Sequence, residues 1–317
     1  MVMMNDSDVS WILFAGTSHK QLGVEVAASL DAPLGKTLFE TFPDGEIGLQ
    51  ILENVRNKDV FLLQSVARRP NHYLMELLIM IDALKRASAR SVAVILPYYP
   101  YARQDRKDRG RVPITAKLVA NLLEKAGVTR LLTMDLHTEQ IQGFFDIPVD
   151  NLYARPLFVR AIRESGLSDI VVVSPDVGSN KMARKFAEDL KTDLAIVDKR
   201  RINAERVEAT ALIGDVEGKN VVMVDDICST GTTLKAAAHV CKQAGAKTIT
   251  ICVSHALMMS NPLESPEIDQ IYLTNTVSPN ATFDHPKVTV LSVADLLGQA
   301  IQRLLSAQSI SSLFMTS

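Results

Sequence analysis

Two adjacent carboxylates, Asp225 and Asp226, are the residues of this chain best suited to chemistry. They follow the apolar run 221–224, which predicts a buried parallel strand, and they precede a short segment rich in Ser, Thr and Gly. A helix is expected over residues 234–244. The carboxylates are therefore predicted at the carboxyl end of a strand, where open α/β sheets bind ligands.

The segment after the carboxylates suits a phosphate. A helix start leaves backbone N–H groups unpaired, and its dipole attracts an anion. Gly231 allows the backbone to come close to that anion. Further donors are the hydroxyl groups of Ser229, Thr230, Thr232 and Thr233. Since the carboxylates would repel a phosphate, they are expected to face vicinal hydroxyls. The pattern predicts a sugar-phosphate site, and the simpler alternative is a turn in which Ser229 or Thr230 only caps the helix.

A second candidate segment is cationic. Residues 97–111 follow a predicted strand at 92–96 and hold five basic residues against two acids. The segment has no hydrophobic periodicity and is long for a loop, and such loops are usually functional. We expect a mobile loop that closes over a polyphosphate. A solvated charged surface and a nucleic-acid contact are the alternatives.

Four further polar groups lie at turns or at predicted strand ends. They are the turn 42–46, the segment 135–137, the segment 174–179 and the basic cluster 198–201. Each has a simpler interpretation when taken alone, such as a hairpin turn for 42–46, a structural role for His137, or an exposed basic turn for 198–201.

Composition sets the broad class. A chain of 317 residues with 47% hydrophobic and 22% charged residues is typical of a globular protein with two domains. The net charge of −2 gives no general attraction to nucleic acid or to anionic membranes. Three cysteines without a CxxC pair are expected to be buried in a reducing compartment. We find no signal peptide and no apolar run of about 18 residues, so the predicted location is cytoplasmic.

Predicted strands and helices alternate along the whole chain. This order predicts an α/β fold of two similar doubly wound domains, each a mainly parallel sheet flanked by helices. We place the domains at residues 1–150 and 151–317. An amphipathic helix predicted over 293–305 is a candidate to pack back onto the first domain.

In this order, the segments resemble a known family. Asp225-Asp226 followed by Ser-Thr-Gly-Thr-Thr is similar to the phosphoribosyl-diphosphate loop of type I phosphoribosyltransferases. From about Phe14 to Phe314 the chain resembles the ribose-phosphate diphosphokinases, or phosphoribosyl diphosphate synthetases. The other supporting motifs are Phe-Pro-Asp-Gly-Glu (42–46), Tyr-Ala-Arg-Gln-Asp-Arg-Lys (101–107), Met-Asp-Leu-His (134–137), Gln-Ile-Gln-Gly-Phe-Phe (140–145), Ser-Pro-Asp (174–176) and Asp-Lys-Arg-Arg (198–201).

The resemblance implies an activity. Family members transfer the β,γ-diphosphoryl group of ATP to the C1 hydroxyl of ribose 5-phosphate, which gives phosphoribosyl diphosphate and AMP for nucleotide biosynthesis. The implied fold is that of type I phosphoribosyltransferases in both domains. The implied cofactor is Mg²⁺, and the implied assembly is a homohexamer built from dimers, with no nucleic-acid or membrane partner.

The resemblance also implies site residues. For ATP they are Phe42, Asp44, Gly45, Glu46, Arg103 and Gln104, of which the first four form an adenine element often contributed across a subunit interface. His137 and Asp176 are implied at the metal site. Lys199 and Arg201 are implied as a transition-state clamp on a flexible catalytic loop. For ribose 5-phosphate they are Asp225 and Asp226 at the ribose hydroxyls, and Ser229, Thr230, Gly231, Thr232 and Thr233 at the 5′-phosphate.

The chain departs from the family pattern at a few positions. Common bacterial members carry Asp-Thr where this chain has Ser229-Thr230, and a glycine pair where it has Gly178-Ser179. Two alternatives share the fold. An ordinary phosphoribosyltransferase would lack the Arg103-Gln104 segment and the 198–201 cluster. A non-catalytic regulatory subunit would be expected to lose His137, Lys199 or Arg201.

Overall fold

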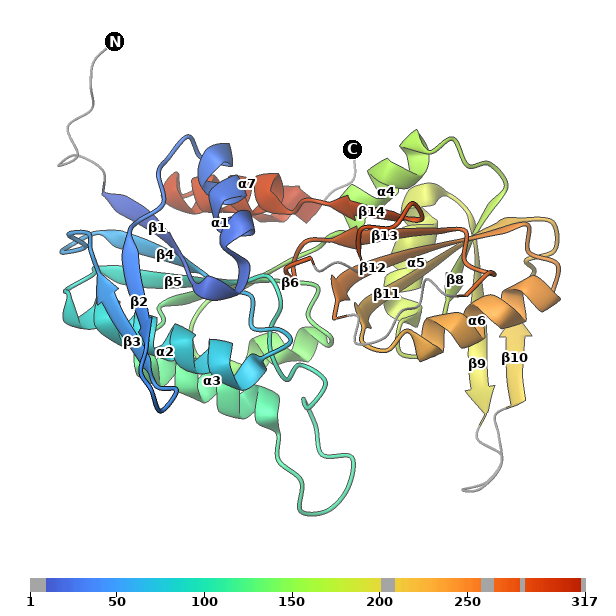
Figure 1. Ribbon diagram of the computed structural model, residues 1–317. Coiled ribbons are helices and arrows are strands. Elements are labelled where there is room, and N and C mark those ends of the chain that lie inside the picture. Colours follow the sequence, from blue (N-terminus) through green and yellow to red (C-terminus); the bar gives the residue numbers. More distant parts are fainter. Residues whose placement is uncertain (1–9, 201–208, 258–264, 280–282, 315–317) are drawn as a thin grey trace, which may run out of the picture. The chain divides into compact units, whose positions relative to one another are not determined.

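The computed structural model describes residues 10–200, 209–257, 265–279 and 283–314 (Figure 1). The chain divides into two compact units. Unit 1 comprises Met1–Leu152 and Ala294–Leu313, and unit 2 comprises Tyr153–Val293 and Phe314–Ser317. Within the described ranges, no helix has the length and apolar character needed to cross a membrane.

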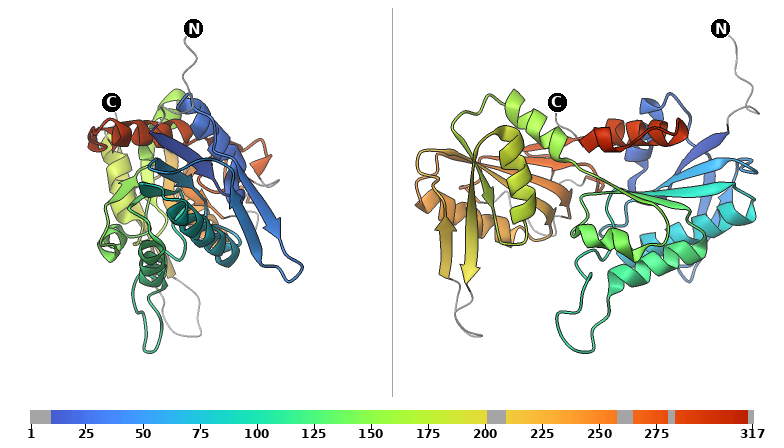
Figure 2. Two further views of the ribbon diagram at one scale, coloured as in Figure 1. Left: turned by 90° about the vertical axis from the view of Figure 1, so that its left-hand side faces the viewer. Right: turned by 180° about the vertical axis from the view of Figure 1, so that it is seen from behind.

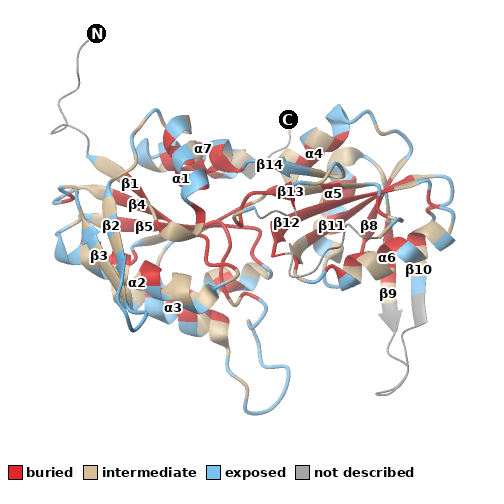
Figure 3. Cartoon of the chain, viewed as in Figure 1, coloured by how far each residue is buried: buried red, intermediate tan, exposed pale blue. Residues whose placement is uncertain are grey.

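Unit 1 is built on a five-stranded parallel sheet in the order β1-β4-β5-β6-β7. The strands are β1 (Trp11–Ala15), β4 (Asp59–Leu63), β5 (Ser91–Leu96), β6 (Arg130–Met134) and β7 (Val149–Leu152). Their side chains are largely buried (Figure 3). Continuous apolar runs of this kind are expected where helices cover both faces of a parallel sheet.

Helices lie on both faces of this sheet (Figure 1). On one face are α1 (Lys20–Ser29) and α7 (Ala294–Leu305), and on the other are α2 (Pro70–Arg86) and α3 (Thr115–Ala126). Helices α1 and α7 contact each other, and Gly298 is needed there because a Cβ at this position would lie 2.1 Å from Ser29 Oγ. The helix predicted near the carboxyl end thus belongs to unit 1.

Two further features of unit 1 stand apart from the sheet. Strands β2 (Thr37–Thr41) and β3 (Ile47–Ile51) form an antiparallel hairpin, drawn in blue in Figure 2, so the predicted turn at 42–46 is confirmed as a hairpin turn. Residues 97–114 contain no helix or strand, and the loop predicted over residues 97–111 lies within this range. Short 3-10 helices occupy Thr17–His19 and Glu139–Phe144.

Unit 2 contains a seven-stranded sheet in the order β10-β9-β8-β11-β12-β13-β14. The strands are β8 (Ile170–Ser174), β9 (Asp193–Arg200), β10 (Ala209–Ile213), β11 (Asn220–Cys228), β12 (Thr248–Ala256), β13 (Gln270–Thr274) and β14 (Val288–Leu291). Every pair is parallel except β9 with β10. Helices α4 (Arg155–Glu164) and α5 (Asn180–Leu190) lie on one face and α6 (Thr232–Gln243) on the other (Figure 1). The predicted fold class is confirmed.

Two predicted strand ends were wrong. Strand β11 does not end at residue 224 but continues through Asp225 and Asp226 to Cys228. The apolar run 194–197 predicts a strand that ends at residue 197, whereas β9 continues to Arg200. Hydrophobicity marks only the apolar part of a strand, whereas these polar continuations are held by backbone pairing. Strand β12 pairs with β11 as far as Cys228 and Ala256, and β10 pairs with β9 from Arg200.

Each sheet has a switch point, where successive connections leave in opposite directions. In unit 2 the chain passes from β8 to β9 on one side, and β11 adds to β8 on the other. In unit 1, β1 lies between β4 and a single parallel bridge from Leu13 to Leu34. Ligands of open α/β sheets bind at the carboxyl ends of the strands at such points.

Candidate functional site

The switch point of unit 2 brings two acidic segments together. Strand β11 pairs with β8 only as far as Met223 and Val173, and β8 ends at Ser174. Asp225 and Asp226 therefore extend past β8, beside the segment that follows it. The site is formed by residues 174–179 after β8, and residues 225–233 at the end of β11 and the start of α6.

The Asp225 carboxyl group at this site is buried and held by hydrogen bonds. It is only 9% exposed, and its Oδ1 accepts hydrogen bonds from Ser179 Oγ at 2.7 Å and from the backbone N–H of Asp226 at 3.1 Å. Burial and the neighbouring Asp226 charge raise the pKa of Asp225 well above its ordinary value, and the Ser179 hydrogen bond opposes that rise. Ligand hydroxyls that donate to this carboxylate would stabilise its charged form.

The hydroxyl-rich segment forms the entry to α6. Ser229 and Thr230 lie in a bend, and Gly231 follows with φ +75°, a left-handed conformation that favours glycine. Helix α6 begins at Thr232, whose hydroxyl lies 3.0 Å from that of Thr230. The predicted sugar-phosphate residues thus lie on one continuous stretch, with carboxyl groups on the strand and hydroxyl and N–H groups at the helix start.

The segment after β8 supplies Asp176 and Ser179. Ser174 Oγ donates to the backbone carbonyl of Asp176 at 2.6 Å, and Asp176 Oδ1 accepts the N–H of Ser179 at 3.0 Å. The Ser179 hydroxyl also reaches Asp225, so this residue connects both acidic segments. Sequence reasoning noted Ser179 only as a departure from the glycine pattern and assigned it no role.

The basic cluster 198–201 is not a turn over its described part. Residues 198–200 belong to β9, and Lys199 pairs with Thr210 of β10. Because β9 pairs with β8 only as far as Ile196, Lys199 lies in a two-stranded ribbon that extends past the carboxyl end of β8. The side chain of Lys199 and the whole of Arg201 lie outside the described residues.

The first group of predicted ATP residues lies at the tip of the β2–β3 hairpin. The Phe42 ring is 46% exposed and packs over Gly48, where a Cβ would lie 3.1 Å from Phe42 Cζ. Gly45 has φ +92°, and Asp44 Oδ1 accepts the N–H of Glu46 at 3.1 Å. The tip therefore presents an aromatic face and two exposed acidic residues from a well-bonded turn.

The second group lies in the loop 97–114. Arg103 is exposed, and the backbone of Gln104 is held by hydrogen bonds to Tyr101 and from Ala116. Asp105 Oδ2 accepts the Thr138 hydroxyl at 2.8 Å, which ties this loop to the segment that follows β6. The structure thus brings the Arg103–Gln104 segment and the predicted His137 segment to the carboxyl ends of neighbouring strands β5 and β6.

The predicted metal residues are divided between the units, since His137 lies in unit 1 and Asp176 in unit 2. No group of three or more His, Cys, Asp or Glu side chains placed to hold a metal ion occurs among the residues that the structure describes. A cation held by either residue would need further ligands from a substrate.

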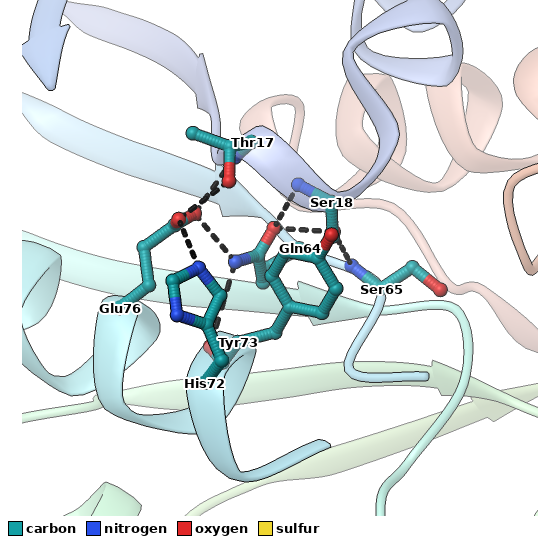
Figure 4. A network of polar contacts seen from close by, with 7 residues as sticks. All are labelled: Thr17, Ser18, Gln64, Ser65, His72, Tyr73 and Glu76. Atoms are coloured by element: carbon teal, nitrogen blue, oxygen red, sulfur yellow. Dashed lines mark hydrogen bonds and ion pairs between the residues drawn. The ribbon is translucent and has the colours of Figure 1, made fainter. Parts of the chain in front are cut away.

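The switch point of unit 1 is filled by its own side chains (Figure 4). The Glu76 carboxyl group from α2 is 2% exposed and accepts the backbone N–H of Thr17 and the side-chain N–H of Gln64, both at 2.7 Å, and the Thr17 hydroxyl. Ser18 bonds to Gln64 and accepts the N–H of Ser65. A carboxyl group thus occupies the place at a helix start where an anion binds.

The three cysteines, Cys228, Cys241 and Cys252, are buried thiols outside disulfide bonds, and their burial was predicted. Burial and the Asp225 charge raise the pKa of the Cys228 thiol to about 12, so it stays protonated at neutral pH. Although Cys228 lies beside the acidic site, it is not an activated nucleophile.

Two family models match this chain, one mainly in unit 1 and the other mainly in unit 2. Residues 11–127 match the model of the N-terminal domain of ribose phosphate pyrophosphokinase, and residues 149–285 match the phosphoribosyl transferase domain. The fold and the strand–loop–helix site of unit 2 therefore define a protein of the phosphoribosyltransferase class.

Full-length relatives narrow this class. Ribose-phosphate pyrophosphokinases of Thermosipho africanus and Thermotoga maritima are 48% and 49% identical to this chain, over 95% of it and 96% and 97% of their own lengths. The crystal structure of phosphoribosylpyrophosphate synthetase from Mycobacterium smegmatis superposes with a TM-score of 0.89 at 41% identity, covering 94% of this chain and 99% of that one. The chain belongs to the ribose-phosphate pyrophosphokinase family.

Proposed function

We propose that this protein transfers the diphosphoryl group of ATP to the C1 hydroxyl of ribose 5-phosphate, giving 5-phosphoribosyl 1-diphosphate and AMP for nucleotide biosynthesis. The observation that carries the proposal is the switch point of unit 2. Its carboxyl groups suit a sugar diol, and the adjoining helix start suits a phosphate. Near-complete coverage by ribose-phosphate pyrophosphokinases supports the same reaction.

The reaction requires charge stabilisation more than a strong base. The C1 oxygen forms a bond to the β-phosphorus, the bond from that phosphorus to the oxygen shared with the α-phosphate breaks, and AMP leaves. Negative charge concentrates on the equatorial oxygens of the transferred group, so nearby cations lower the barrier. We assign this role to Lys199 and Arg201, and the ribbon that carries Lys199 supports it by extending past the carboxyl end of β8.

In the acceptor site, Asp225 and Asp226 accept hydrogen bonds from the ribose hydroxyls. The 5′-phosphate binds at the start of α6, to backbone N–H groups and to the hydroxyl-bearing residues of the loop. These residues are Ser229, Thr230, Gly231, Thr232 and Thr233. The left-handed Gly231 supports this assignment because it lets the backbone approach the phosphate closely.

Mg²⁺ fits the donor chemistry of Asp176. Its carboxyl group is a hard oxygen donor, and its Oδ1 is oriented by the Ser179 N–H. Sites of this kind hold Mg²⁺ through one or two carboxylates plus substrate phosphates, which does not require a cluster of three protein ligands. We assign Asp176 in unit 2 and His137 in unit 1 as metal-site residues, and bound Mg²⁺ would neutralise charge on the polyphosphate.

ATP binding falls to unit 1 in this proposal. Arg103 and Gln104 contact the nucleotide from the loop after β5, and the exposed Phe42 ring with Asp44, Gly45 and Glu46 recognises the adenine from the hairpin tip. The high exposure of that tip supports a contribution across a subunit interface. We propose a homohexamer built from dimers as the assembly.

The test is a phosphorus NMR time course of the protein with ribose 5-phosphate, ATP and Mg²⁺. We expect AMP and a C1-diphosphate of ribose to appear together at equal rates. Formation of ADP alone would identify a monophosphoryl kinase and contradict the proposal. An absence of any product would favour a non-catalytic regulatory subunit of this family.

A further inference from the structure

Ser179 links the two acidic segments of the unit 2 switch point. Its hydroxyl oxygen lies 2.7 Å from Asp225 Oδ1 and 3.3 Å from Asp176 Oδ1, and its backbone N–H donates to Asp176 Oδ1 at 3.0 Å. A serine hydroxyl has one proton, and the shorter distance assigns that proton to Asp225. The Ser179 side chain therefore donates a hydrogen bond to Asp225, and its backbone N–H donates one to Asp176.

The hydroxyl does not perform the structural role that its position suggests. Ser179 is the N-cap residue of α5, where a serine side chain usually accepts a hydrogen bond from a backbone N–H two or three residues further on. The Ser179 side chain makes no such capping bond. Because this hydroxyl does not cap α5, its removal should change the orientation of Asp225 more than the stability of the helix.

The contact controls the orientation of a buried carboxyl group. Both hydrogen bonds described for Asp225, from Ser179 Oγ and from the N–H of Asp226, go to Oδ1. Two donors on one oxygen fix the plane of the carboxyl group, which also lies within hydrogen-bond reach of the Asp226 carboxyl group. The donor from β11 itself is a rigid backbone group, whereas the Ser179 hydroxyl comes from a different segment and also sets the distance to Asp176.

We propose that Ser179 is a positioning residue for the sugar. Its hydroxyl holds the Asp225 carboxyl group in the orientation in which the adjacent Asp225 and Asp226 carboxyl groups accept hydrogen bonds from the vicinal hydroxyls of ribose 5-phosphate. This inference rests on the proposed function, because it takes ribose 5-phosphate as the ligand of the unit 2 switch point.

The experiment compares Ser179→Ala, Ser179→Gly and Ser179→Thr with the wild type in calorimetric binding of ribose 5-phosphate and in steady-state kinetics. Ser165→Ala is the matched control, since it deletes a hydroxyl outside the site, which donates to Ile162 O at the end of α4 and also contacts Tyr272. For Ser179→Ala and Ser179→Gly we expect the Kd and the KM for ribose 5-phosphate to rise about tenfold, the loss typical of one hydrogen bond to a charged group. The KM for ATP and the melting temperature should stay at wild-type values, and Ser179→Thr should restore binding.

The outcomes separate this inference from the proposed function. If the wild type binds ribose 5-phosphate and forms AMP, and Ser179→Ala binds it equally well, the positioning role is wrong while the function stands. A parallel rise in both KM values together with a lower melting temperature would also overturn it, because that pattern indicates a structural role. If the wild type neither binds ribose 5-phosphate nor forms AMP, the proposed function fails and this inference fails with it.

Discussion

The two units place different chemistry at equivalent points of their sheets. In unit 2 the carboxyl ends of β8 and β11 carry Asp176, Asp225 and the loop into α6, an arrangement suited to a sugar phosphate. In unit 1 the ends of β1 and β4 carry Thr17 and Gln64, and the Glu76 carboxyl group closes that space from α2 (Figure 4). In our proposal one switch point binds a ligand, whereas at the other the polar side chains of the protein bond to one another.

The polar groups at the unit 1 switch point stabilise the fold, whereas we propose that those at the unit 2 switch point bind a ligand. The Glu76 network satisfies its buried donors internally, and Gly16 leaves room for it, since a Cβ there would lie 2.5 Å from Gln64 Oε1. At the unit 2 switch point, Asp225 instead remains buried beside a second carboxyl group, which raises its pKa and costs folding energy. Such a cost is typical of functional sites.

We expect the largest loss of activity from a substitution in unit 2, at Lys199. Lys199→Ala should lower turnover about 10²–10³-fold, because one charge-stabilising contact to a developing negative charge is typically worth that much. Binding of ribose 5-phosphate should be retained. The measurement is AMP formation under saturating substrates together with calorimetric binding.

Lys247→Ala is the control, since it removes an exposed lysine that precedes β12. Full activity of Lys199→Ala would show that Lys199 has no role in the reaction, and it would weaken the proposal that unit 2 holds catalytic residues.

The next effect compares the two buried carboxyl groups directly. Asp225→Asn should weaken ribose 5-phosphate binding about 10–100-fold, because hydrogen bonds to a charged acceptor are worth about 1.5–3 kcal/mol. Its melting temperature should not fall, since the amide keeps the shape of the carboxyl group and its Oδ1 acceptor and cannot ionise in the buried site. Glu76→Gln should leave the affinity for ribose 5-phosphate unchanged. Equal loss of affinity in both variants would break the comparison.

Much of this contrast could be predicted from sequence on the unit 2 side. Hydrophobic runs located the strands, and the adjacent acids with the Ser-Thr-Gly loop were visible as a linear motif. The Glu76 network could not be predicted, because Thr17, Gln64 and Glu76 are far apart in the chain and Glu76 falls within an amphipathic helix pattern. Ser179 was missed for the same reason, since only the folded sheet brings it to Asp225.

Strands β10, β13 and β14 also escaped prediction, because their short segments have partly exposed residues and are held by pairing with neighbours. Hydrophobic patterns report burial, whereas these strands depend on backbone hydrogen bonds to neighbouring strands that the sequence does not reveal.

A third prediction measures what the filled switch point contributes. Glu76→Gln replaces one acceptor oxygen by a donor group among the Thr17 and Gln64 donors, so it should lower the free energy of unfolding of unit 1 by about 1–3 kcal/mol. Trp11 is the single tryptophan and lies in β1, so its fluorescence during urea unfolding reports on unit 1. The control Asp82→Asn breaks an exposed ion pair with Arg86 in the same helix and should change stability by less than about 0.5 kcal/mol. Equal effects of the two substitutions would show that the network adds nothing beyond a surface contact.

The smallest expected effect concerns Cys228, which lies at the ligand-binding switch point yet is predicted to be chemically silent. Its thiol is 2% exposed and its pKa is raised to about 12, so the thiol stays almost entirely protonated between pH 7 and 9. The native protein should therefore not react with a thiol-specific disulfide reagent in this range, whereas in urea all three cysteines should react. The raised pKa also determines how the free energy of unfolding changes with pH. As pH rises past about 8.5, the unfolded chain loses its Cys228 thiol proton before the native protein does. This residue therefore lowers the stability of the native protein at alkaline pH. Rapid native labelling of one thiol at pH 8, slowed by ribose 5-phosphate, would instead identify Cys228 as accessible from the site.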